Sequence, residues 1–234
     1  MTAGIDTPDR RGRTGLHRHG LDLTGNTRVW IREVEVLSCD WYVLRKITFD
    51  YQRSDGLWSR QQRETYDRGN GATILLYNTD RQTVLLTRQF RLPAYVNAHP
   101  DGMLLETAAG LLDGDDPDEA IRREAAEETG HTIGTAQHIF DVYMSPGSVT
   151  ERLHFFAAPY GRHTATSAPG GIAAEGEDIT TIELPFRKAL AMIRSGEIAD
   201  AKTIMLLQWA ALEGPFSATA ERGPAAAKQG PATA

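Results

Sequence analysis

Apolar and polar residues alternate along three stretches in the first third of the chain, 29–37, 41–51 and 58–66. Each stretch is rich in β-branched and aromatic residues, which is typical of half-buried β-strands. Ser54-Asp55-Gly56 separates the last two stretches and predicts a hairpin turn. We therefore expect a small antiparallel sheet over residues 28–67, and such a sheet is marginal alone and needs another surface to cover it.

The pattern changes after residue 68, where continuous apolar runs predict buried strands and apolar residues at helical spacing predict helices. The expected strands are 72–77, 83–87, 138–143, 153–158 and 179–184, and the expected helices are 117–129, 185–193 and 201–210. Strands that alternate with helices favour an α/β layered core. Residues 68–212 should form this main domain, and the polar or low-complexity segments 1–27 and 213–234 should be disordered tails.

An acidic helix is the most distinctive of these elements. Residues 109–115 are interpreted as a loop that leads into it. Asp116 can cap its first turn, and Pro117 occupies a position where a missing N–H has little cost. Gly130 can adopt the left-handed conformation that ends it. The sequence therefore sets both ends of this helix.

Three carboxylates lie on one face of the acidic helix, because Glu124, Glu127 and Glu128 are spaced at i, i+3 and i+4. Like charges at this spacing repel, so the cluster needs a counter-charge. Oxygen ligands of this kind suit Mg²⁺ or Mn²⁺. The alternative is a solvated surface helix whose glutamates are neutralised by Arg122 and Arg123.

Composition narrows the class of protein. The 234 residues carry a net charge of −6, which argues against nucleic acid as a partner because such binding relies on clustered Lys and Arg. No apolar run is long enough for a membrane span, so a membrane partner is not expected. Cys39 is the only cysteine, which excludes an intrachain disulfide and predicts a reducing, cytoplasmic location.

Residues 110–131 resemble the Nudix box, G-x5-E-x7-R-E-U-x-E-E-x-G-U with U apolar, the signature of Nudix hydrolases. The matching residues are Gly110, Arg123, Glu124, Glu127, Glu128 and Gly130. The segment from Gly110 to Arg123 is one residue shorter than the pattern, Asp116 stands in place of Glu, and His131 replaces the last apolar residue. The resemblance implies an α/β/α sandwich with a mixed sheet, preceded by the small N-terminal antiparallel sheet.

The Nudix resemblance also implies metal-dependent hydrolysis of a pyrophosphate bond. It assigns Glu124, Glu128 and the Ala109 carbonyl as ligands of Mg²⁺, with Mn²⁺ as a possible substitute. Glu127 would assist them, and Arg123 would orient the glutamates. Glu177 would complete the metal shell, although Gly176 stands where the family has an acidic residue.

Residues 66–79, 88–91 and 144–151 are similar to a narrower group, the GDP-mannose pyrophosphatase subfamily, whose relatives include the ADP-ribose pyrophosphatases. This resemblance implies cleavage of GDP-mannose to GMP and mannose 1-phosphate by a homodimer that exchanges its N-terminal sheets. The implied substrate contacts are Trp41, Gln62, Arg63, Glu64, Arg91, Ala109, Gly110, Leu111, Glu151 and Lys202. Either Glu151 or Glu177 would be the base, and the sequence does not choose between them.

Simpler roles for these residues stay open. Trp41 can belong to the sheet core, Arg91 can pair with Glu106, and Glu151 can be a surface partner of Arg152. ADP-ribose or another nucleoside-diphosphate sugar is the alternative substrate. A non-catalytic Nudix-fold regulator that binds nucleotides is the alternative class, which the intact glutamates disfavour.

Overall fold

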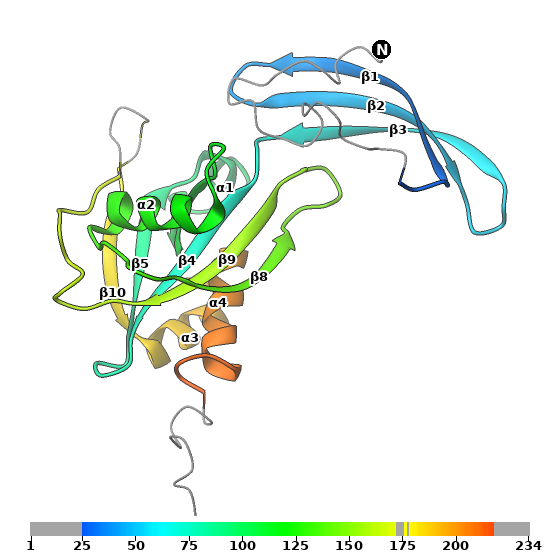
Figure 1. Cartoon of the computed structure of the whole chain (residues 1–234). Coiled ribbons are helices and arrows are strands. Elements are labelled where there is room, and N and C mark those ends of the chain that lie inside the picture. The colour runs from blue at the N-terminus through cyan, green and yellow to red at the C-terminus, as the bar shows by residue number, and fades with distance from the viewer. Residues whose placement is uncertain (1–24, 172–175, 177, 218–234) are drawn as a thin grey trace, which may run out of the picture.

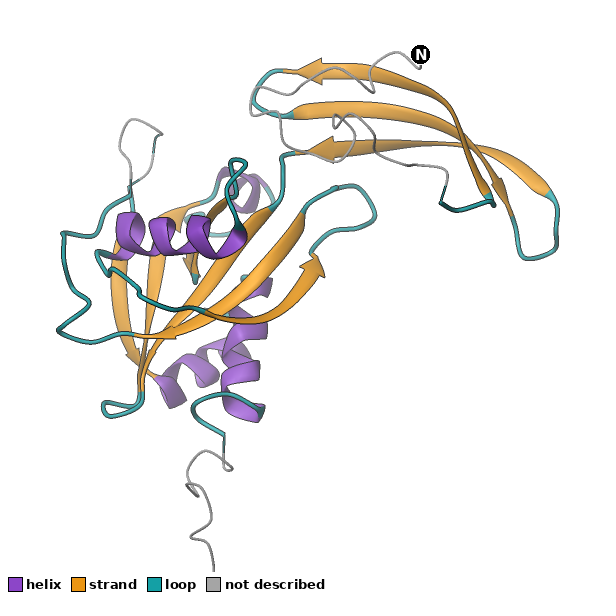
Figure 2. Ribbon diagram, in the orientation of Figure 1, coloured by secondary structure: helices purple, strands orange, loops and turns teal. Residues whose placement is uncertain are grey.

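The computed structural model describes residues 25–171, 176 and 178–217. Most of the two tails that we predict to be disordered lies outside these residues. The strands are β1 Val29–Cys39, β2 Val43–Gln52, β3 Trp58–Asp67, β4 Gly71–Asn78, β5 Thr83–Phe90, β6 Met103–Glu106, β7 Ala108–Leu111, β8 Gln137–Tyr143, β9 Arg152–Pro159 and β10 Thr180–Pro185. The helices are α1 Leu92–Val96, α2 Pro117–Thr129, α3 Phe186–Ser195 and α4 Ala201–Leu212. Figures 1 and 2 show their arrangement.

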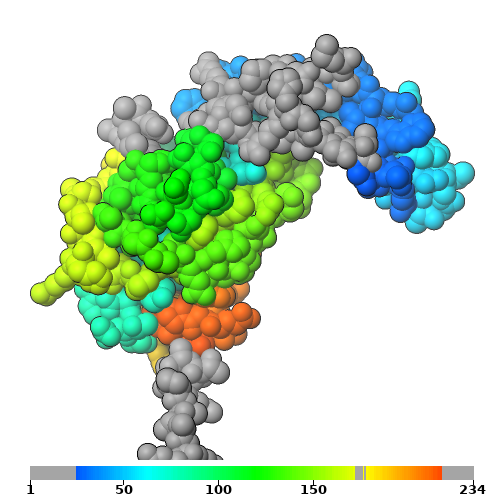
Figure 3. Space-filling model, viewed as in Figure 1, coloured from blue at the N-terminus to red at the C-terminus, as the bar shows by residue number. Residues whose placement is uncertain are grey.

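The N-terminal sheet has the order β1-β2-β3, and both of its strand pairs are antiparallel. The predicted hairpin turn between β2 and β3 is confirmed, since Gly56 has φ +83 and its N–H donates to the Arg53 carbonyl. This sheet projects beyond the rest of the molecule (Figure 3). Trp30 and Trp58 contact each other on it, with ring centroids 5.2 Å apart, and both remain about half exposed.

The main sheet has the order β10-β5-β4-β9-β8, with β6 beside β5 and β7 beside β4. Strands β4 and β5 pair only near their hairpin, over Leu76–Asn78 and Thr83–Leu85. Beyond it they diverge, and β7 pairs with the start of β4 while β6 pairs with the end of β5. The β4–β9 pair is parallel and the others are antiparallel, so the predicted mixed sheet is confirmed.

The core has two layers because successive strand residues point to opposite faces. On one face, Phe156 of β9 packs with Ile121 and Ala125 of α2. On the other, Phe155 packs with Leu206 and Leu207 of α4. Helices therefore cover both faces of the sheet, and the expected α/β/α sandwich is confirmed. None of the helices in the described part of the chain is long and apolar enough to cross a lipid bilayer.

Two sequence-based expectations are wrong. Residues 109–111 are not part of a loop but belong to strand β7, which pairs with β4 from Gly71 to Ile74. Alanine and glycine have little intrinsic preference for strands, so the pairing with β4 determines this conformation. Trp41, expected at the start of a strand, lies instead in the turn between β1 and β2.

Two polar contacts fix the parts of the molecule that surround the split between β4 and β5. Thr107, between β6 and β7, donates its N–H to Thr203 Oγ1 of α4 at 2.7 Å. At the end of β3, the buried Asp67 pairs with Arg45 at 2.8 Å and accepts a hydrogen bond from Thr150 Oγ1 at 2.8 Å. The first contact anchors α4 at the split, and the second joins the N-terminal sheet to the β8–β9 loop.

Two leucines of α4 provide a test of the core. Leu206 is fully buried, so Leu206→Ala should lower the free energy of unfolding by about 2–5 kcal/mol. Leu212 is 76% exposed in the same helix, so Leu212→Ala is the matched control and should cost no more than about 0.5 kcal/mol. Urea denaturation measures both changes. Similar losses for the two variants would contradict this packing.

Candidate active site

Helix α2 has the ends that its sequence predicts. Asp116 accepts a hydrogen bond from the Asp118 N–H at 3.0 Å, and Pro117 begins the helix. Gly130 has φ +74 and donates its N–H to the Ala126 carbonyl. The caps therefore fix which residues are helical, and the side chains that the helix buries fix its rotation about its axis.

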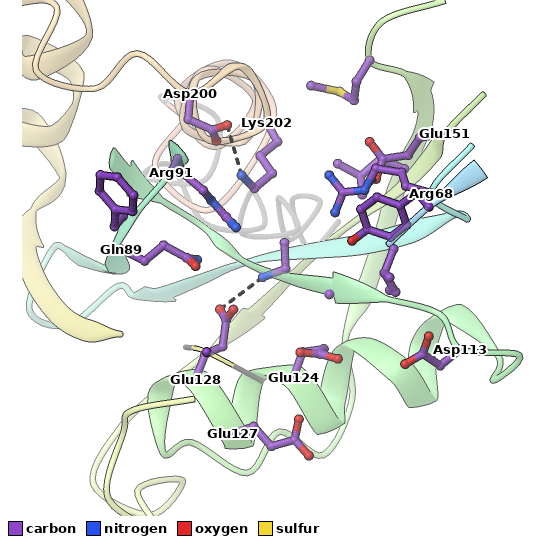
Figure 4. Close-up of a pocket in the computed structure, with 18 of the residues that line it drawn as sticks. Arg68, Gln89, Arg91, Asp113, Glu124, Glu127, Glu128, Glu151, Asp200 and Lys202 are labelled. Atoms are coloured by element: carbon purple, nitrogen blue, oxygen red, sulfur yellow. Dashed lines mark hydrogen bonds and ion pairs between the residues drawn. The ribbon is translucent and has the colours of Figure 1, made fainter. Parts of the chain in front are cut away.

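The rotation of α2 sets its carboxylates beside its apolar residues. Ile121 and Ala125 are buried against the sheet. Glu124 and Glu128 follow them by three residues each, so they flank the same face of the helix. Together with Glu127 they line a cavity, where Figure 4 shows them.

Strand β7 meets these carboxylates at very short range. The Ala109 N–H donates to Glu128 Oε2 at 3.3 Å, and Glu128 is only 2% exposed. A Cβ atom on Gly110 would lie 2.1 Å from the Cδ of Glu124, a distance that no packing allows. Only glycine can therefore occupy position 110 while Glu124 keeps this place.

Arg123 lies at the edge of the carboxylate cluster. Its Nη1 is 2.9 Å from Glu124 Oε1 and 3.4 Å from Glu127 Oε2. Arg122 contacts Asp118 instead, at 2.9 Å. The surface-helix alternative requires both arginines to neutralise the glutamates. In the described contacts, only Arg123 reaches them.

The opposite wall of the cavity carries a network of four charged groups. Arg91 binds both oxygens of Glu106 at 2.8 Å. Lys202 lies 2.5 Å from Glu106 and 3.0 Å from Asp200. Burial acts to raise the pKa of Glu106, but Lys202 and Arg91 outweigh it and hold that pKa at about 2. Arg91 therefore does pair with Glu106, as the simpler alternative predicted. Both Arg91 and Lys202 nevertheless line the cavity.

A third wall comes from the β8–β9 loop and the N-terminal sheet. Glu151 lies 3.5 Å from the Nε of Arg68, whose guanidinium stacks 5.6 Å above the Tyr42 ring. Arg152 does not pair with Glu151, as one alternative proposed, but with Asp141. Figure 4 shows Glu151 and Arg68 together at one side of the cavity.

The cavity has a volume of about 540 Å³, which is within the usual range for small-molecule sites. It brings together most of the residues singled out from the sequence. These are Trp41, Arg91, Ala109, Gly110, Leu111, Arg123, Glu124, Glu127, Glu128, Glu151 and Lys202. Trp41 is 56% exposed, so it is not part of the sheet core.

Three of the described sequence-based candidates do not line this cavity. Gln62, Arg63 and Glu64 lie on β3, in the N-terminal sheet, and do not line the cavity of their own chain. Gln62 bonds to Thr48 at 3.0 Å within that sheet. Glu177 lies outside the described residues.

Comparison with known proteins identifies the family of this chain. Residues 67–207 match the family profile described as the NUDIX domain. The chain belongs to the Nudix family. Residues 28–66 match a second profile, the GDP-mannose pyrophosphatase NudK N-terminal domain, so the chain falls in the subfamily that its sequence resembles.

Several relatives of this Nudix hydrolase carry the name GDP-mannose pyrophosphatase. The protein of Pectobacterium atrosepticum is 56% identical over 187 residues, which cover 80% of this chain and 96% of the relative. That of Yersinia enterocolitica is 57% identical over 180 residues, 77% of this chain and 93% of the relative. That of Salmonella typhimurium is 54% identical over 175 residues, 75% of this chain and 91% of the relative.

Nudix hydrolases depend on divalent metal ions, and the donor set of this chain fits such an ion. Glu124, Glu127 and Glu128 offer only oxygen ligands, which Mg²⁺ and Mn²⁺ prefer. Glu128 is almost completely buried, and a buried carboxylate needs positive compensation. These features match the chemistry of the family without specifying which ion binds.

The sequence analysis missed several residues that line the cavity of this Nudix fold. They are Tyr42, Arg68, Gln89, Phe90, Met103, Asp113, Met144, Leu153, Asp178 and Asp200. Gly176, which the sequence analysis noted as a departure from the family, lines the cavity as well. A signal existed for Asp200, because an Asp three residues before Thr203 predicts a helix cap, and Asp200 does cap α4. Arg68 and Tyr42 carry no such local signal, since only the fold brings them to Glu151.

The contact between Gly110 and Glu124 can be tested with a methyl group. Gly110→Ala should lower pyrophosphatase turnover about 100-fold, because displacement of a catalytic group by about 1 Å can cost this much. Gly134→Ala is the matched control: its Cβ would meet nothing within 4 Å, so turnover should not change. Steady-state kinetics of the two variants measure the effect. Wild-type turnover in Gly110→Ala would contradict the geometry.

Proposed function

We propose that this chain hydrolyses the pyrophosphate bond of GDP-mannose, releasing GMP and mannose 1-phosphate. Relatives that are 56% and 57% identical over 187 and 180 residues bear the name of that activity. The observation that carries the proposal is the cavity itself, where the carboxylates of α2 face Arg91 and Lys202 across the split in the sheet. A metal site and donors for a phosphate group thus share one space.

In this proposal, Glu124, Glu128 and the carbonyl of Ala109 hold Mg²⁺, and Mn²⁺ can replace it. The ions supply positive charge that screens the pyrophosphate and stabilises the leaving phosphate. Glu127 assists the two ligands. Arg123 acts as a positioning residue, because its contacts at 2.9 and 3.4 Å hold Glu124 and Glu127 in place and offset their mutual repulsion.

We keep two candidates for the base that accepts a proton from the attacking water. Glu151 is supported by its place in the cavity wall, where Arg68 restrains it at 3.5 Å. Glu177 is supported by the subfamily resemblance. A base must lie within hydrogen-bond reach of the water, either directly or through a second water.

Substrate binding would use the remaining walls of the cavity. Arg91 donates Nε and Nη2 to Glu106, which leaves its Nη1 donors for a phosphate oxygen. Lys202 would contact the same end of the substrate. Trp41 is an exposed aromatic group in the wall, and we propose that it stacks on the guanine base.

We further propose that the protein is a homodimer whose N-terminal sheets are exchanged between subunits. Gln62, Arg63 and Glu64 are implied substrate contacts, yet they do not line the cavity of their own chain. Exchange would bring them to the cavity of the second copy. Trp30 and Trp58 would gain cover in the same step, since each is about half exposed. The cytoplasmic location stays a prediction.

A substrate panel tests the activity. Purified protein with Mg²⁺ should convert GDP-mannose faster than GDP-glucose, ADP-ribose or ADP-glucose, with GMP and mannose 1-phosphate detected by chromatography. Glu128→Gln should reduce this turnover by at least about 100-fold, because it removes the charge of a metal ligand. Turnover of ADP-ribose alone would support the alternative substrate, and tight GDP-mannose binding without any turnover would support the binding regulator.

Mixed dimers test the exchange. We expect chains carrying Glu128→Gln and chains carrying Arg63→Ala, each weakly active alone, to regain activity when they are combined. In an exchanged dimer, one of the two sites would then contain both substitutions and the other would be intact. Glu124→Gln chains mixed with Glu128→Gln chains are the control and should stay inactive, since both changes affect the metal site of their own chain. A monomeric mass in light scattering, or no gain in the first mixture, would contradict the proposal.

A further inference from the structure

A second group of metal-ligating side chains lies outside the candidate active site, on strands β8 and β9. His138 and Asp141 belong to β8, and His154 belongs to β9. Their ligand atoms, two imidazole nitrogens and a carboxylate oxygen, all lie within 4.8 Å of one another. We propose that this triad binds a borderline divalent metal ion, with Zn²⁺ as the probe of choice, independently of the Mg²⁺ site.

A bulge in β8 creates the triad. Residues three apart in a regular strand point to opposite faces of the sheet. The register of β8 against β9 shifts between His138 and Phe140, so one extra residue is inserted there. His138 and Asp141 therefore point to the same face, and Asp141 lies directly opposite His154.

The triad lies on the face of the sheet that α2 covers. Phe140 packs against Phe155 in the core shared with α3 and α4, which fixes the orientation of β8. His138, on the opposite face, contacts the ring of Phe156. Strand β8 is at the edge of the sheet (Figure 1), and the side chain of His138 is 51% exposed. An ion from solvent can thus reach the three ligands.

The three donors converge on one point. His138 Nε2 and His154 Nδ1 each lie 2.7 Å from the same oxygen, Oδ1 of Asp141. Tetrahedral zinc sites have bonds of about 2.0–2.1 Å, which separates ligand atoms by about 3.3 Å. An ion could therefore enter after shifts of about half an ångström, made mainly by His138 and Asp141, whose side chains are more exposed than that of His154. Water would fill the fourth position.

The ligand types separate this site from the active site. Two imidazoles with one carboxylate suit Zn²⁺ and its neighbours, whereas the oxygen-only cluster of Glu124 and Glu128 suits Mg²⁺ and Mn²⁺. An excess of Mg²⁺ should fill the oxygen site without competing for the nitrogen ligands. The two sites can therefore be measured apart in one protein.

Arg152 opposes the ion. Its guanidinium forms an ion pair with Oδ2 of Asp141, next to the proposed site. Its side chain is 45% exposed, so it can turn toward solvent when a cation binds. Removal of this positive charge should therefore increase the affinity for the ion.

The test is a calorimetric titration of the chelator-treated full chain with Zn²⁺ in a large excess of Mg²⁺. We expect one Zn²⁺ per chain. Loss of an outer-shell partner already costs about 10- to 100-fold in metal affinity, so His138→Ala and His154→Ala should each weaken binding by at least about 100-fold. Arg152→Gln should strengthen it. Glu124→Gln/Glu128→Gln should leave it unchanged.

His17→Ala/His19→Ala is the matched control for His138→Ala/His154→Ala, since it removes the same number of imidazoles from the sequence. Visible Co²⁺ spectra provide a second readout, because imidazole ligands change its absorption, and circular dichroism verifies that each variant is folded. The proposal is overturned if wild-type protein binds no Zn²⁺. It is equally overturned if the His138→Ala/His154→Ala variant binds normally, or if binding is lost with Glu124→Gln/Glu128→Gln.

Discussion

The seating of helix α2 against strand β7 determines where the rest of the site lies. The carboxylate of Glu124 occupies the space that a side chain at position 110 would fill, and the backbone of Ala109 donates to Glu128. Three carboxylates on one helical face repel one another, so other interactions must hold the helix in this position. The apolar residues of α2 supply them, because Ile121 and Ala125 are buried against the sheet and hold the neighbouring carboxylates in place.

The split between β4 and β5 supplies the space that faces those carboxylates. Paired strands would close the sheet there, but β6 and β7 each take one of the diverging edges. Thr107 stands between them and bonds to Thr203, which brings the start of α4, and with it Lys202, to the far wall. The buried pair of Arg45 and Asp67 similarly fixes the N-terminal sheet beside the loop that carries Glu151. Two polar anchors thus organise a cavity within an apolar core.

Most of the fold follows from the sequence, because long periodic segments carry strong signals. The strands of the N-terminal sheet and the bounds of α2, α3 and α4 agree with the prediction to within a few residues. Strands β6 and β7 could not be predicted in this way, since each has four residues and depends on a partner strand far away in the chain. The short helix α1 was missed for the same reason of length.

The site residues likewise differ in whether local sequence spacing or long-range packing brings them together. The carboxylates of α2 are local, because a helix brings residues three and four apart together. Arg68 and Tyr42 are not, since they reach Glu151 only through the packing of the N-terminal sheet on the β8–β9 loop. The placement of Gln62, Arg63 and Glu64 is more remote still, because within one chain they lie away from the cavity.

The balance of charge across the cavity couples the metal to the substrate. The α2 wall has three carboxylates and one guanidinium, from Arg123, so its formal charge is −2. The facing network of Arg91, Lys202, Glu106 and Asp200 has two positive and two negative groups and is formally neutral. An anionic pyrophosphate would therefore enter a negative space, in which only bound cations reverse the field. It follows that metal and nucleotide sugar should each strengthen the binding of the other, by the reciprocity that linkage requires.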